Sequence, residues 1–156
     1  LNVHPAWLLF GQQPSEIREQ SVEYAREHHL DNKIQILGTI TSGPEKTSHA
    51  YFSFPSPSDN TYALKVDVDN CAPRMLYGET LILEPDLDPS PGDEVIINQA
   101  DFVRVYSLID ILPDKLVVCD LSEAENTMLI DPEKIVYMHV VIARISRKLS
   151  EHQKPD

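Results

Sequence analysis

Cysteine is scarce in this 156-residue sequence, which contains only Cys71 and Cys119. The two cysteines form no Cys-x-x-Cys pair, and neither lies near a histidine at the spacing of metal ligands. The six histidines are scattered, and no two of them are four residues apart. Because a metal site needs several ligands in a defined geometry, we expect neither a zinc site nor a cofactor. The shortage of cysteine also indicates a reducing compartment.

Basic residues are also in short supply, because 13 Lys and Arg accompany 25 Asp and Glu and leave a formal net charge of -12. A surface that binds nucleic acid needs concentrated Lys and Arg side chains that displace counterions from the phosphates. We therefore do not expect these residues to contact DNA themselves.

Long apolar runs are missing as well, since no stretch reaches the roughly 18 apolar residues of a membrane-spanning helix. The start, "LNVHPAWLLFGQQP", has neither the basic n-region nor the small-residue cleavage site of a secretory signal. We predict a soluble, cytoplasmic protein that does not contact a membrane. Because the sequence opens on Leu1 rather than Met, we expect it to be part of a longer chain.

Three segments are predicted to lie outside the main domain. Residues 1–12 carry a dense apolar cluster, including Trp7, in a stretch too short to form a core, so we expect them to pack against upstream sequence. Residues 13–32 are predicted to form a helical linker, with Ser15 as a potential N-cap and only a narrow apolar stripe. Residues 149–156 are predicted to be a flexible tail.

Residues 33–148 are predicted to form one mostly β domain of short antiparallel strands. Turn-rich segments such as "TSGPEKTS" and "PDLDPSPGD" separate short β-prone runs, and no helix-length pattern lies between the runs. Parallel strands would need long crossovers, so antiparallel pairing is expected. We place one strand at Ile34 to Ile40 and a long late strand at Ile135 to Ile145. The predicted runs are "KIQILGTI", "HAYFSF", "YALKVDV", "TLILE", "EVIIN", "DFVRVYSL", "KLVVCDL", "NTMLI" and "KIVYMHVVIARI".

The stretch "YALKVDVDNCAPRMLYGETLILEP" has the form strand, polar loop, strand. It resembles the nucleophile segment of LexA-like self-cleaving repressors and phage CI-type repressors. The pattern of that family is aromatic-Ala-Leu-Arg-Val-x-Gly-Asp-Ser-Met-x-Pro, followed by Gly-Asp and a strand. This sequence keeps the Asp and the Pro, but Val68 replaces the Gly, Asn70 the catalytic Ser and Cys71 the Met.

Other segments extend the resemblance over nearly the whole chain. "DFVRVYSL" is similar to the strand that carries the general-base Lys, and the Lys position falls on Arg104. "ILGTITSGP" is similar to the segment with the Ala-Gly bond that the family cleaves, with Ser42 and Gly43 in its place. "LNVHPAWLLFG" resembles the closing helix of a Cro/CI-type helix-turn-helix domain. The resemblance implies a LexA-like C-terminal fold from a bacterial or phage-encoded protein.

The chemistry of that family needs a Ser hydroxyl whose proton passes to a neutral Lys, so the Lys pKa must be lowered by desolvation. A guanidinium stays protonated in proteins, so Arg104 cannot accept the proton, and the carboxamide of Asn70 is a poor nucleophile. We therefore predict an inactive pseudo-peptidase, and we expect Asn70 and Arg104 to hydrogen-bond to each other. The alternative to an inactive protein is a peptidase that uses Cys71 as its nucleophile. The alternative to the hydrogen-bonded pair is that Asn70 is an ordinary loop residue and Arg104 an exposed strand residue.

The resemblance implies the C-terminal oligomerisation and regulatory domain of a transcriptional repressor, acting as a homodimer or a higher oligomer. Operator DNA would be bound by an upstream helix-turn-helix unit, and dimerisation would raise the effective concentration of the second unit. A further alternative is a module that binds a ligand or an antirepressor protein. The late strand carries apolar residues on both faces, because both sets of alternating positions are apolar. This pattern is typical of a strand that is buried on both faces or lies at an interface. We predict dimer contacts at Val136, Met138, Val140 and Ile142.

Overall fold

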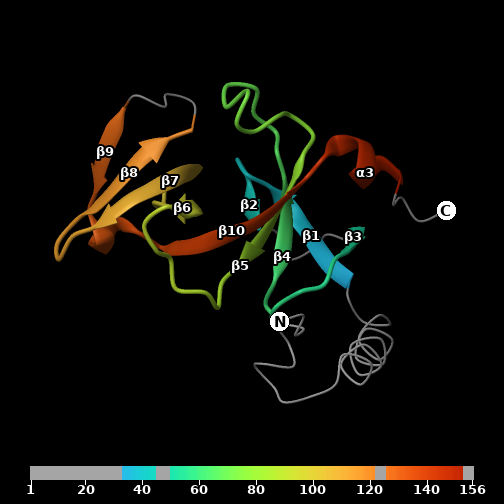
Figure 1. Cartoon of the computed structure of the whole chain (residues 1–156), viewed down its shortest axis with the longest axis horizontal. Helices are drawn as coiled ribbons and strands as arrows, with labels where there is room; N and C mark the ends of the chain where they lie inside the picture. The colour runs from blue at the N-terminus through green and yellow to red at the C-terminus, as the bar shows by residue number, and fades with distance from the viewer. Residues whose placement is uncertain (1–32, 45–49, 122–125, 153–156) are drawn as a thin grey trace, which may run out of the picture. The chain divides into compact units, whose positions relative to one another are not determined.

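The computed structural model describes residues 33–44, 50–121 and 126–152, and these form a ten-stranded sheet with short helical turns (Figure 1). The predicted mostly β class is confirmed. The predicted linker at 13–32 and the segment 1–12 lie outside the described residues. The elements are β1 (Lys33–Thr39), β2 (Gly43–Pro44), β3 (Ala50–Ser53), β4 (Tyr62–Lys65), β5 (Thr80–Glu84), β6 (Glu94–Asn98), β7 (Val103–Ile111), β8 (Leu116–Asp120), β9 (Thr127–Ile130), a 3-10 helix (Pro132–Lys134), β10 (Tyr137–Ile145) and α3 (Arg147–His152).

The strands follow the order β2-β1-β4-β5-β10-β6-β7-β8-β9, and β3 pairs with β1 beside β2. Pairing is antiparallel as predicted, except that β1 and β4 run parallel, with Gln35 opposite Tyr62. Hairpins join β6, β7 and β8 because each connection is short. The long strand β10 crosses the middle of the sheet between β5 and β6 (Figure 1).

Some element bounds differ from the sequence-based expectation. The first strand spans Lys33–Thr39 rather than Ile34 to Ile40. The late strand begins at Tyr137 rather than Ile135, because the backbone N–H of Ile135 caps the preceding 3-10 helix by donating to the Pro132 carbonyl at 3.1 Å and does not join the sheet ladder. Asp131 caps the start of that helix by accepting a hydrogen bond from the backbone N–H of Glu133 at 3.1 Å. At the other end, α3 occupies part of the 149–156 segment that was predicted to be a flexible tail.

The core lies on both faces of the central strands. All five residues of β5 are buried. Leu81 and Leu83 pack into one cluster, and Ile82 packs on the opposite face with Ile34 and Phe52. A strand covered on both faces carries a continuous apolar run instead of an alternating one, as "TLILE" does. The loop between β4 and β5 covers the first face and contributes buried Cys71 and Met75 to the same cluster.

Candidate functional site

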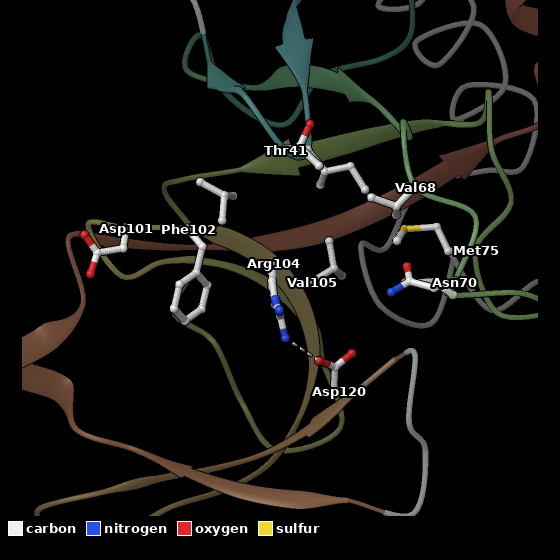
Figure 2. Close-up of a pocket in the computed structure, with 12 residues that line it drawn as sticks. Thr41, Val68, Asn70, Met75, Asp101, Phe102, Arg104, Val105 and Asp120 are labelled. Carbon is white, nitrogen blue, oxygen red and sulfur yellow. Dashed lines mark hydrogen bonds and ion pairs between the residues drawn. The ribbon is translucent and has the colours of Figure 1, made fainter.

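A cavity of about 300 Å³ opens where the β4–β5 loop meets β7 and the end of β8 (Figure 2). The loop supplies Asn70, Cys71 and Met75, and the turn after β1 supplies Ile40 and Thr41. The remaining lining residues are Val68, Asp101, Phe102, Val103, Arg104, Val105 and Asp120. Residues far apart in the sequence therefore form one site.

The backbone of the β4–β5 loop fixes the position of Asn70. Val66 N–H donates to the carbonyl of Glu79 at 2.8 Å, and Gly78 N–H donates to the carbonyl of Val66 at 2.9 Å, which closes the base of the loop. Gly78 has a φ of +86°, a conformation that side-chain-bearing residues rarely adopt. The closed base holds the loop against the cavity, where Asn70 itself remains exposed.

Asn70 and Arg104 line the same cavity, but the predicted hydrogen bond between them is wrong. Arg104 Nη1 instead donates to Asp120 Oδ2 at 3.2 Å, and the Arg104 side chain is 56% exposed while that of Asp120 is 11% exposed (Figure 2). Asp120 lies opposite Tyr106 in the β7–β8 ladder, which brings its carboxylate to the face that Arg104 shares. A carboxylate is a stronger acceptor for a guanidinium than a neutral amide is, so it displaces Asn70 as the partner.

Cys71 is a buried residue whose surroundings favour the protonated thiol. Burial raises the pKa of the Cys71 thiol, the Asp120 carboxylate raises it further, and the Arg104 guanidinium opposes these effects only in part. Its Sγ lies 3.6 Å from Asn70 Oδ1 and acts as a weak donor. Because the thiolate is the nucleophilic form, this environment disfavours the alternative of a peptidase that uses Cys71.

The turn that carries Ser42 and Gly43 lies at the rim of the cavity. Gly43 pairs with Thr39 across the turn and has a φ of +73°. A Cβ at Gly43 would lie 3.4 Å from Tyr137 Oη and 3.7 Å from Val103 Cγ2, so the turn packs beside a strand that lines the cavity. Ile40 and Thr41 form part of the wall, whereas Ser42 and Gly43 are not among the lining residues.

Asp67 holds this turn in place. Its carboxylate accepts hydrogen bonds from the Thr41 hydroxyl and, at 3.2 Å, from Thr41 N–H. Burial alone would raise the pKa of the Asp67 carboxyl, but the hydrogen bonds from Thr41 and Thr39 outweigh it and lower the pKa. The contribution of Asp67 to folding stability is therefore complete above the unfolded-state pKa. It is lost as the pH falls through the lowered folded-state pKa of Asp67.

We expect the Thr41 amide resonance to titrate with Asp67, at a midpoint below the usual Asp value of about 3.9. NMR titration of the amide between neutral and acid pH measures this midpoint. In an Asp67→Asn variant the titration of this amide should be absent. A midpoint at or above the usual value would show that the hydrogen bonds do not hold the carboxylate.

Part of β7 beside the cavity has a described strand partner on one side only. Val103 to Ser107 pair with β6 on one side, whereas pairing with β8 on the other side begins only at Tyr106. Within the described residues, Val103, Arg104 and Val105 therefore have a strand neighbour on one side only. Sequence analysis missed both this edge and Asp120, although the acidic end of the apolar run "KLVVCD" was a visible signal.

The four residues predicted to make dimer contacts differ in exposure. Val136 precedes β10 and is 65% exposed, while Val140 is 6% exposed within the protomer. Met138 and Ile142 are partly buried and pack against two different core clusters. The late strand is thus covered on both faces inside the described unit, and the prediction of a dimer remains a prediction.

A scan against protein-family models found no match to the sequence, and a search of curated proteins found none either. Among the residues that the structure describes, no three His, Cys, Asp or Glu side chains cluster in a way that could hold a metal ion. The helical segments of that part of the chain are also too short and too polar to cross a membrane.

Proposed function

We propose that this chain is the oligomerisation and regulatory domain of a transcriptional repressor that does not cleave itself. One observation carries the proposal: the two positions that resemble a Ser-Lys dyad, Asn70 and Arg104, line one cavity although they lie far apart in the sequence. The turn that resembles the cleavage segment lies at the rim of the same cavity. The arrangement suits a LexA-like site in which the reactive groups have been replaced.

The residues in the cavity argue against acyl transfer. Asn70 offers no hydroxyl, and the guanidinium of Arg104 stays protonated while it pairs with Asp120. Cys71, the remaining candidate nucleophile, is 7% exposed and its pKa is raised. Asn70, Arg104 and Cys71 therefore do not combine an activated nucleophile with a base. In the proposed role, operator DNA is bound by an upstream helix-turn-helix unit, and this domain holds two copies together.

A second candidate function is a module that binds an antirepressor protein or another ligand at the cavity. Among the described residues, no strand pairs with the second side of β7 at Val103–Val105, and this favours the module because an extended peptide can add to such an edge. The half-exposed guanidinium of Arg104 has donors beyond the one that Asp120 uses, and it lies 5.2 Å from the centroid of the Phe102 ring. These groups would recognise backbone carbonyls of such a peptide.

The wild-type protein is expected to remain intact at Ser42–Gly43, both during alkaline incubation and with an activated recombinase filament. High pH helps a Lys-dependent reaction by deprotonating the amine, whereas Arg104 does not deprotonate in that range. Mass spectrometry of the incubated protein measures the result.

The matched variants test which groups are responsible. Cleavage in an engineered protein should require both Asn70→Ser and Arg104→Lys, and either change alone should leave the bond intact. A wild-type fragment ending at Ser42 that disappears in Cys71→Ala would identify a cysteine peptidase and overturn the proposal.

A further inference from the structure

Strand β9 forms one edge of the sheet, with β8 as its neighbour and, within the described residues, no strand on its other side (Figure 1). An edge strand presents unpaired backbone N–H and C=O groups that can pair with another chain. Proteins usually protect such an edge with a charged residue, a proline or a bulge. The sequence of β9, Thr-Met-Leu-Ile, contains none of the first two, and its pairing with β8 has no register shift.

Two apolar side chains of this edge strand are exposed. Met128 is 40% exposed and Leu129 is 64% exposed, and as consecutive strand residues they point to opposite faces of the sheet. Ile111 and Leu112 of the β7–β8 hairpin are exposed as well, but β8 lies between them and β9. We name Met128 and Leu129 the β9 edge patch.

The other end of the sheet is a weaker candidate for pairing. Strand β3 is also uncharged, and it pairs with β1. Its large side chains are Tyr51, which is exposed, and Phe52, which is buried in a core cluster. The β3 edge therefore exposes one large apolar residue and the β9 edge exposes two, so more apolar area is available at β9.

Charge indicates which partner covers the β9 edge patch. Two copies of a chain with a net charge of -12 repel each other unless the contact surface is free of carboxylates. The four residues of β9 carry no charge, and the next residue, Asp131, has its carboxylate 3.5 Å from Lys115 Nζ of the same protomer. A basic partner would instead be attracted to carboxylate-rich surface. The uncharged edge thus suits a second copy of this chain.

We propose that two copies of the domain pair antiparallel through β9, with the β9 edge patch packed across a twofold axis. Such a contact is self-complementary, because the same backbone groups and apolar side chains face each other. Strand β10 offers only part of each edge, because β5 pairs with it along Val140–Ile145 and β6 pairs with it along Tyr137–Val140. The inference rests on the oligomerisation role in the proposed function and assigns that role to a different surface from the predicted late strand.

Leu129→Lys tests the interface in the full chain by sedimentation velocity at micromolar concentration. We expect the wild type to be a dimer and the variant a monomer, with a dimer dissociation constant raised about 100-fold because each dimer buries two lysines. Tyr51→Lys at the opposite edge and Val136→Lys at the predicted late-strand contact are matched controls that should remain dimeric. Amide exchange at residues 127–130 should also slow as wild-type concentration rises.

The outcomes separate the interface from the function. A wild-type dimer that persists in Leu129→Lys, with β9 amides that exchange at the same rate at every concentration, would overturn the β9 interface and leave the oligomerisation role intact. Loss of the dimer in Val136→Lys but not in Leu129→Lys would overturn it in favour of the late strand. A wild-type protein that is a strict monomer would overturn both proposals.

Discussion

Leu83→Ala is expected to lower the free energy of unfolding by about 2–5 kcal/mol, the range for truncating a fully buried leucine. Leu83 is 0% exposed and belongs to the cluster that also contains Tyr62 and Leu64. Its strand lies between β4 and β10, so the neighbouring backbone is held by hydrogen-bonded ladders on both sides and cannot collapse into the space. The loss therefore includes a cavity penalty in addition to the lost burial.

Urea denaturation monitored by circular dichroism measures this change, at one fixed protein concentration because association adds to stability. Leu87→Ala is the matched control, since Leu87 is 46% exposed in the turn after β5. The control should change the free energy of unfolding by less than about 0.5 kcal/mol. Equal losses in the two variants would contradict the assignment of Leu83 to the core.

Glu84→Ala is expected to cost about 3 kcal/mol of unfolding free energy, because it removes a buried charged acceptor from several donors. Glu84 is 1% exposed. Its carboxylate accepts hydrogen bonds from the Ser58 hydroxyl at 2.8 Å, from Asp86 N–H at 2.9 Å and from the Thr61 hydroxyl. These bonds tie the segment before β4 to the end of β5, so the variant leaves three donors without their acceptor.

The pH dependence of Glu84 has a defined sign. Burial alone would raise the pKa of the Glu84 carboxyl, but hydrogen bonds from Thr61, Asp86 and Ser58 outweigh it and lower the pKa. Its contribution is thus complete above the unfolded-state value of about 4.3 and disappears as the pH falls through the lowered folded-state pKa. The stability difference between wild type and Glu84→Ala should therefore shrink in acid.

Denaturation curves at neutral pH and at successively lower pH measure that difference. Asp88→Ala provides the control, because Asp88 is an exposed carboxylate a few residues further along the chain. If the difference in unfolding free energy between wild type and Glu84→Ala grew toward acid pH, the donors would not stabilise the Glu84 carboxylate in the folded state.

The chemical limits of Asn70 and Arg104 could be inferred from residue identity alone, while their surroundings could not. An amide and a guanidinium have the same chemical limits in any fold, so the prediction of an inactive pseudo-peptidase needed no coordinates and remains a prediction. The partner of Arg104 depends on the β7–β8 register, which brings Asp120 beside it after a turn. The expected contact with Asn70 was wrong because that register was not visible in the sequence.

The sequence by itself determined the mostly β class and the approximate position of most strands. Alternating and β-branched runs such as "EVIIN" and "KLVVCD", divided by Pro, Gly and Asp, carry a local preference that does not depend on distant residues. The composition likewise determined the net charge of -12, which governs self-association.

Only the tertiary structure decided which strands lie at the edges and which lie inside. The runs "NTMLI" and "KIVYMHVVIARI" are both apolar, yet β9 pairs with one strand and β10 with two. Likewise, β1 and β4 pair in parallel although the local signals favoured antiparallel hairpins. Strand pairing joins residues far apart in the chain, and its free energy comes from side chains that meet only after folding. Local sequence therefore specified the strands, and long-range packing specified their neighbours.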